Sequence, residues 1–399
     1  MPAAAEVLQK CLSGVFGLMH ATRARALIKA VQALLVSRRL ILIEMARAWP
    51  QANQVSAPLK CLDRLLSNPH LHEQREALYA EIMGWLVRVR NPIILVDWSD
   101  LHADCRWQLL RAAVPMGGRT MTLLDLVFPE SMKGSPKAER ELLARLKALL
   151  PSSIKPIVVT DAGFRAPWFR AVAKLGWQYV GRLRSRTQIK LHGKPWMDNR
   201  KFLPKASGTA QRFNQAAIVA SNPLRVDLVL HRKKRAGRVQ LNRHGAPKRS
   251  ARSLKAQRGA REPWLLVAST GLSQLSAQQI AAIYATRMQI EESFRDLKCD
   301  RFGCAFYYSQ TREPERIATL LLIHALAAFV TWLARLSMSQ KATKLYGGTH
   351  GPRTRPYYSV FRIAWDALRR SDPHCTLSAL FNAFMHPPDY FFDNMRVPP

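Results

Sequence analysis

Acidic residues are scarce in this sequence: of 399 residues, 27 are Asp or Glu and 61 are Lys or Arg, which gives a formal charge of +34 at pH 7. The hydrophobic fraction of 48% is that of a folded protein and excludes a disordered basic tail. A folded protein with this charge needs a polyanion, and we expect nucleic acid as its partner. Ribosomal and membrane-surface proteins are the other classes that the charge allows.

Clustered cysteine and histidine motifs are also absent. The six cysteines stand at positions 11, 61, 105, 299, 304 and 375 without a Cys-x-x-Cys motif, and no His-x-x-x-His motif occurs. These spacings do not predict a structural zinc site. We interpret the cysteines as reduced thiols of a cytoplasmic protein.

Long hydrophobic runs are rare. The stretch IATLLLIHALAAFVTWLA, residues 317–334, is borderline in length for a membrane span and is interrupted by His324 and two threonines. We therefore predict a buried core helix there and no membrane partner.

Helical periodicity without strand-like alternation marks the first 85 residues, in which many Arg and Lys are interspersed. This pattern predicts a helical DNA-binding domain. The alternative is a helical subdomain whose basic face is merely solvated. A second helical region is expected at residues 336–399.

Strands and helices alternate after residue 86, which predicts an α/β core. We expect a helix at 135–150 and strands in NPIILVDWSD (91–100), GRTMTLLDLVF (118–128) and KPIVVTDAGF (155–164). Two of these strands end in an aspartate, Asp97 and Asp161. Such carboxylates commonly gather at one edge of a sheet for catalysis or metal binding, although a capping role is the alternative for each.

The chain then changes character. WQYVGRLR, RFNQAAIVAS, LRVDLVLH and EPWLLVAST have the composition of strands, and residues 231–261 hold twelve Lys or Arg and no acid. Because that charge cannot be buried, we predict an exposed loop suited to phosphate contacts, a solvated face being the alternative. Residues 171–270 are thus interpreted as a β-rich insertion in the core.

The segment YATRMQIEESFRDLK, residues 284–298, predicts a helix with distinct faces. At about 100° per residue, Tyr284, Arg287, Glu291 and Lys298 lie in one stripe roughly 60° wide. The adjoining stripe is apolar and consists of Ile283, Ile290, Phe294 and Leu297.

The four polar residues should therefore lie at the edge of the buried face, while Glu292 and Asp296 point toward solvent. The alternative is a solvated flank with ion pairs along the helix, from Arg287 to Glu291 and from Glu291 to Arg295.

Three carboxylates, Asp97, Asp161 and Glu291, can hold two divalent cations about 4 Å apart, and oxygen ligands favour Mg²⁺, with Mn²⁺ as a substitute. Two such ions can activate a water or a 3′ hydroxyl and stabilise the leaving oxygen of a phosphodiester. We expect Arg287 and Lys298 to bind phosphates near the cleaved bond.

The spacing of Tyr284, Arg287, Glu291 and Lys298 resembles the signature of the DDE transposases of bacterial insertion sequences, in the family numbered four. The resemblance implies an RNase H-like core interrupted by a β-rich insertion, with Asp97, Asp161 and Glu291 as catalytic metal ligands. Its expected parts are residues 1–85 (DNA-binding), 86–170 and 271–335 (the two halves of the core), 171–270 (insertion) and 336–399.

The resemblance also implies how the protein contacts DNA. Tyr284, Arg287 and Lys298 would bind the transposon end, and Trp264, which opens the strand WLLV, would receive a flipped base; a core tryptophan is the alternative. It implies cut-and-paste transposition through a hairpin, with double-stranded DNA and a second copy of the chain as partners. A magnesium-dependent nuclease and a DNA-binding protein without catalysis are the other hypotheses.

Overall fold

The computed structural model describes residues 2–184, 186–232, 246–247, 249–251, 253–254, 262–339 and 358–398. The chain divides into two compact units: unit 1, Met1–Lys155 with Met288–Arg396, and unit 2, Pro156–Arg287 with Val397–Pro399. The fold is mixed α/β, as predicted. The predicted basic loop at 231–261 lies mostly outside the described residues.

The N-terminal part of unit 1 is helical, which confirms the predicted secondary structure. A side-chain cap marks the start of α6: the Asn68 side chain accepts a hydrogen bond from Leu71 N, and Pro69 follows at the first helical position. The helices are α1 (Pro2–Cys11), α2 (Ser13–Leu18), α3 (Ala21–Ser37), α4 (Leu42–Arg47), α5 (Ser56–Leu66) and α6 (Pro69–Leu86).

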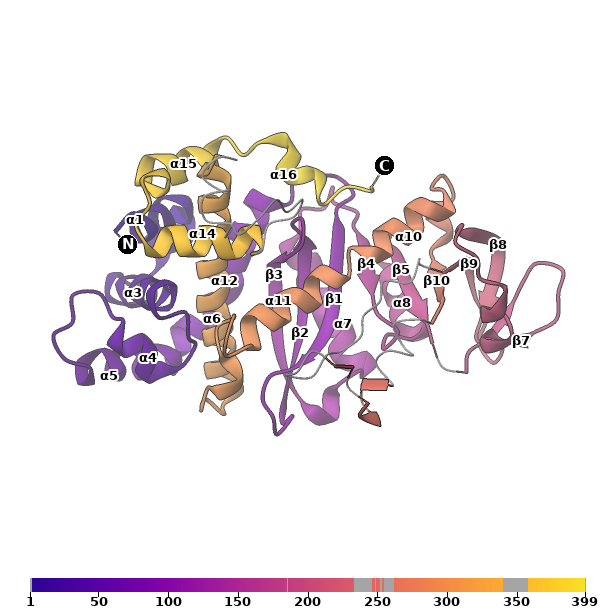
Figure 1. Ribbon diagram of the computed structural model, residues 1–399, viewed down its shortest axis with the longest axis horizontal. Helices are drawn as coiled ribbons and strands as arrows, with labels where there is room; N and C mark the ends of the chain where they lie inside the picture. Colours follow the sequence, from indigo (N-terminus) through magenta and orange to yellow (C-terminus); the bar gives the residue numbers. More distant parts are fainter. Residues whose placement is uncertain are drawn as a thin grey trace. The chain divides into compact units, whose positions relative to one another are not determined.

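Three antiparallel strands follow in unit 1, in the order β3-β2-β1. They are β1 (Ile93–Asp100), β2 (Trp107–Pro115) and β3 (Thr120–Pro129), followed by η1 (Glu130–Met132) and the predicted polar helix, α7 (Pro136–Leu149). Nearly every residue of the three strands is buried, so both faces of the sheet are covered. Helix α11 (Met288–Lys298) crosses one of these faces (Figure 1).

The predicted position of Asp97 at a strand end is wrong. Strand β1 continues for three residues beyond it, to Asp100, because Trp98, Ser99 and Asp100 keep their pairing with β2. Asp97 therefore lies inside a paired strand. Strand β2, whose buried residues do not alternate in polarity, was not predicted.

Helix α12 (Pro314–Ser337) forms the centre of unit 1, as predicted for residues 317–334. By length and composition it could cross a membrane, but its apolar window is completely buried by protein. Its neighbours include α3, α6 and β3. The remaining described elements are η5 (Phe306–Tyr308), α14 (Val360–Arg369), η6 (Pro373–Cys375), α15 (Leu377–Met385) and α16 (Asp389–Asp393), so the described part of the C-terminal region is helical.

Unit 2 contains seven described strands in the order β4-β5-β10-β9-β8-β6-β7, of which β4 and β5 are parallel. They are β4 (Ile157–Thr160), β5 (Gln178–Leu183), β6 (Gln188–Lys190), β7 (Met197–Asp198), β8 (Gln211–Ile218), β9 (Leu224–His231) and β10 (Trp264–Ala268). The helical elements are α8 (Ala166–Lys174), η2 (Asn199–Lys201), η3 (Leu203–Lys205), η4 (Thr270–Leu272) and α10 (Ala277–Ala285).

The predicted single helix at 284–298 is wrong, because α10 ends at Ala285 and α11 begins at Met288. At the junction, Thr286 N bonds to Ile283 O (3.2 Å) and Arg287 N to Tyr284 O (3.1 Å), three residues back instead of four. The Thr286 hydroxyl also donates to Ile283 O at 2.7 Å. This tightening ends the α-helical ladder, so the predicted common stripe holds only within each helix.

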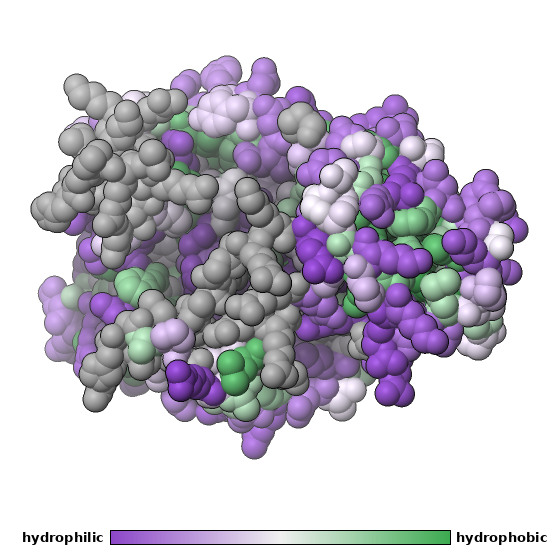
Figure 2. Space-filling model, turned by 45° about the vertical axis from the view of Figure 1, so that its right-hand side comes forward, coloured by the Kyte–Doolittle hydropathy of each residue, from purple (hydrophilic) through white to green (hydrophobic). Residues whose placement is uncertain are grey.

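The apolar stripe is confirmed, since Ile283, Ile290, Phe294 and Leu297 are buried. The expectation that Glu292 and Asp296 face solvent is wrong. The two side chains are only 23% and 22% exposed, and both pair with Arg119 near the start of β3. On the face shown in Figure 2, hydrophilic side chains predominate among the described residues, and hydrophobic ones form smaller groups.

Candidate active site

Asp97 lies in the middle of β1 and is 8% exposed. The backbone N–H of Trp98 donates to its Oδ1 at 2.9 Å and orients the carboxyl group. Asp97 stands opposite Arg111 in β2, which in turn stands opposite Asp125 in β3. Cross-strand partners share a face of the sheet, so three charged residues form a row across it.

Arg111 and Asp125 make a buried bidentate ion pair in this row. Nε and Nη2 of Arg111 donate to the two carboxylate oxygens of Asp125, each at 2.7 Å, and both side chains are 1% exposed. Burial lowers the pKa of Arg111, but the charge and the hydrogen bonds of Asp125 together outweigh it and the net shift is upward, so Arg111 stays protonated. The sequence offered a sign of this ion pair, because β2 and β3 each carry one charged residue among apolar ones, but the pair was not predicted.

Helix α11 carries both Glu291 and Lys298. Glu291 is exposed in the first turn, where a negative charge suits the helix dipole. At the other end of the helix, Lys298 Nζ donates to Ser99 Oγ at 2.8 Å and to Asp100 O at 3.2 Å. The structure thus brings Lys298 to the end of β1 that follows Asp97.

The surroundings of Lys298 affect its charge. Burial lowers the pKa of its ammonium group, an effect that the carboxylates of Asp100 and Asp97 oppose. Lys133 Nζ pairs with Asp100 Oδ1 at 2.6 Å. Sequence reasoning missed Ser99 and Lys133; the period of two along a strand could have found Ser99, because it shares a face with Asp97.

In unit 2, Asp161 comes directly after β4, as predicted. Its Oδ1 accepts a hydrogen bond from Gly163 N at 2.7 Å, and the side chain is half-buried. A Cβ at Gly163 would lie 3.0 Å from the same oxygen, so glycine permits this close turn.

Trp264, Tyr284 and Arg287 contact one another in unit 2. The rings of Trp264 and Tyr284 meet edge to face with their centroids 4.9 Å apart, and the Arg287 guanidinium lies 5.9 Å from the Tyr284 ring centroid. Tyr284 is 4% exposed, and burial raises the pKa of its hydroxyl. Trp264 is half-buried. Three residues predicted for DNA binding therefore form one packed group.

Asp97 and Glu291 belong to unit 1 and Asp161 to unit 2. In the part of the chain that the structure describes, no group of three or more His, Cys, Asp or Glu side chains lies together as a metal site. The donor chemistry nevertheless suits a hard cation, because all three predicted ligands are carboxylates.

Comparisons with known proteins identify the family. Residues 90–330 match the family profile described as a transposase DDE domain. The solved piggyBac transposase synaptic complex with hairpin DNA is similar at 12% identity and a TM-score of 0.41, over 99% of this chain and 82% of that chain. The comparison with curated proteins found no match. Since the matched range covers more than half of the sequence, the chain belongs to the family of transposases with a DDE domain, which are metal-dependent enzymes of phosphoryl transfer in DNA transposition.

Proposed function

We propose that this transposase belongs to the insertion-sequence family numbered four and moves its DNA by cut and paste, on an RNase H-like core. The spacing of Tyr284, Arg287, Glu291 and Lys298 supports this assignment. So do the stretches VDWSD, VTDAGF and RMQIEESFRDLK, which resemble the transposase of the tetracycline-resistance transposon Tn-ten.

One observation carries the proposal: the bonds from Lys298 to Ser99 and Asp100 in β1. They join the last residue of the four-residue signature to the strand that carries the first predicted acid, 199 residues away for Ser99. A solvated helix flank would not make such bonds, since its polar side chains would face water.

In the proposed site Asp97, Asp161 and Glu291 would hold two Mg²⁺ ions, for which Mn²⁺ could substitute. When bound, such ions supply a nucleophile at neutral pH and stabilise the leaving oxygen of the phosphodiester. Trp98 N holds one oxygen of Asp97, and Gly163 N one oxygen of Asp161, so backbone donors orient two of the carboxylates.

The remaining signature residues position DNA. Arg287 can bind a phosphate through two N–H groups, while Lys298 offers a single positive charge. The half-buried indole of Trp264 stacks on a flipped base, and Tyr284 supports it edge-on.

The proposed reaction has four phosphoryl transfers at each DNA end. Water attacks one strand, which leaves a 3′ hydroxyl on the transposon end and a 5′ phosphate on the flanking DNA. This 3′ hydroxyl attacks the phosphodiester of the opposite strand and forms a hairpin, with the 3′ hydroxyl of the flanking strand as leaving group. Water reopens the hairpin, and the 3′ hydroxyl then attacks target DNA. Two copies of the chain act together, one on each transposon end.

The proposal is tested with purified protein, Mg²⁺ and a duplex carrying the DNA end that flanks its own gene, resolved on a denaturing gel. We expect a hairpin from the unaltered protein and bound but uncut duplex from Glu291→Gln. Glu313→Gln, a change at an exposed glutamate of unit 1, should cleave normally.

Other outcomes identify the alternatives. Cleavage without a hairpin or strand transfer would indicate a nuclease. Binding without cleavage by the unaltered protein would indicate a DNA-binding protein without catalysis.

A further inference from the structure

Helix α11 has a polar face roughly opposite the one that carries Glu291 and Lys298. Four residues form this face and together span about 100° of the helix circumference, since each residue turns the helix by about 100°. They are Gln289, Glu292, Ser293 and Asp296, and all four contact the turn that joins β2 to β3. The apolar stripe of α11 lies between the two polar faces.

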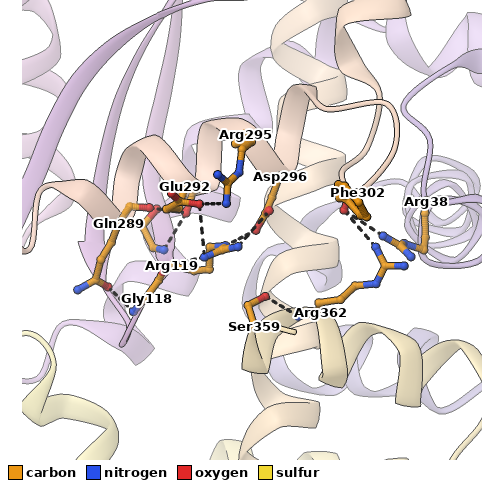
Figure 3. Close-up of polar contacts among 12 residues, drawn as sticks. Arg38, Gly118, Arg119, Gln289, Glu292, Arg295, Asp296, Phe302, Ser359 and Arg362 are labelled. Atoms are coloured by element: carbon orange, nitrogen blue, oxygen red, sulfur yellow. Dashed lines mark hydrogen bonds and ion pairs between the residues drawn. The ribbon is translucent and has the colours of Figure 1, made fainter. Parts of the chain in front are cut away.

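Gln289 holds the turn through its side-chain oxygen. Oε1 accepts hydrogen bonds from two backbone groups, Met116 N at 3.0 Å and Gly118 N at 2.9 Å (Figure 3). Gly118 has a φ of +108°, which a residue with a Cβ rarely adopts. The turn therefore has the one residue type that lets both N–H groups point at the same oxygen.

Ser293 continues the contact one helical turn later. Its Oγ accepts from Thr120 N at 2.8 Å and from Thr120 Oγ1 at 2.9 Å, and it donates to Gln289 O at 3.1 Å. Both side chains are buried, so water does not compete for these bonds.

Arg119 completes the set with charge. Its Nε and Nη2 donate to the carboxylate of Asp296, and its Nη1 lies 3.9 Å from Glu292 Oε2 (Figure 3). The Arg119 side chain is 16% exposed, so screening by solvent is reduced.

We infer that this turn, residues 116–120, is a positioning latch for Glu291. The inference rests on the proposed role of Glu291 as a metal ligand. Apolar packing alone is non-directional and allows α11 to rotate or slide on the sheet. The hydrogen bonds and the guanidinium–carboxylate pair on the opposite face prevent both movements, because these interactions form only in particular directions. The latch thereby sets where the Glu291 carboxylate stands.

The latch is tested by Gln289→Leu, which removes the acceptor at similar size, and by Gln289→Glu, which keeps an acceptor oxygen. Gln278→Leu makes the same change at an exposed position of α10 and serves as the control. Two quantities are measured: Mn²⁺ binding to the protein–DNA complex, from the electron paramagnetic resonance signal of free Mn²⁺, and the Mn²⁺ concentration for half-maximal cleavage.

We expect Gln289→Leu to weaken Mn²⁺ binding and raise the half-maximal concentration by ~10-fold, as with other residues that orient metal ligands, at unchanged DNA affinity. Gln289→Glu should restore both, and Gln278→Leu should change neither. Ser293→Ala gives a second route if Gln289→Leu does not fold, with the same expected direction.

Equal Mn²⁺ binding by Gln289→Leu and the unaltered protein would overturn the inference, even if the variant melts at a lower temperature. This failure differs from failure of the proposed function. If Glu291→Gln still cleaves DNA, then Glu291 is not a metal ligand, and the turn at residues 116–120 has no metal ligand to position.

Discussion

His324 shows how a single buried residue makes this protein sensitive to acid. It lies on α12 in unit 1, is 6% exposed, and neither ring nitrogen has a hydrogen-bond partner among the described residues. Burial, aided by the charge of Arg111, lowers the pKa of its imidazole to about 3. The folded protein thus keeps His324 neutral over a range where the unfolded chain binds a proton.

The sign of the effect follows from proton linkage. The unfolded chain takes up a proton at His324 below a pH of about 6.5, and the folded protein does so only near pH 3. The free energy of unfolding therefore decreases as the pH is lowered from about 6.5 to about 3. We expect His324→Leu to remove about 2 kcal/mol of the difference in unfolding free energy between pH 7 and pH 5. Urea unfolding at both pH values measures it, with the exposed His70→Leu as a control. An unchanged difference in His324→Leu would contradict this account.

Individual residues varied in how far the sequence predicted them. Asp161 stands directly after a strand, as expected from the apolar run that precedes it. The burial of Tyr284 against Trp264 was not foreseeable, because it depends on a strand and a helix meeting in space. The bonds of Lys298 to β1 depend in the same way on residues far along the chain.

Among the elements, the predicted helices and strands mostly followed their sequence patterns, whereas strand β2 and the junction between α10 and α11 did not. Hydrophobic periodicity continues through residues 283–297 without interruption. The break arises from local competition, in which Thr286 bonds to Ile283 and shortens the ladder. Such a side-chain bond to the backbone does not alter the spacing of the hydrophobic residues, so the periodicity cannot reveal it.

The end of α11 depends on close backbone packing. Gly303 N donates to Cys299 O at 3.1 Å, and Cys304 N donates to Asp296 O at 2.7 Å. A Cβ at Gly303 would overlap the Asp296 carbonyl group. We therefore expect Gly303→Ala to lower the unfolding free energy by roughly 1–3 kcal/mol, because backbone must move.

Urea unfolding of Gly303→Ala measures this loss. Gly208→Ala is the matched control, since no atom lies within 4 Å of its added Cβ. Equal stability of the two variants would show that the end of α11 tolerates displacement.

At the scale of the whole molecule, the charge of +34 fits a protein that handles DNA, and the family match agrees with it. Composition indicates only the class of partner. In the proposed mechanism the chemistry comes from three acids, residues of a type that is scarce in this chain. The central claim is thus that Asp97, Asp161 and Glu291 bind the metal.

The measurement that tests this claim most directly is cleavage of end DNA by Asp161→Cys in Mg²⁺ and in Mn²⁺. A thiolate is a poor ligand for Mg²⁺ and a better one for the softer Mn²⁺. We expect no cleavage in Mg²⁺ and restored cleavage in Mn²⁺. Cleavage in Mg²⁺ at the rate of the unaltered protein would contradict the claim.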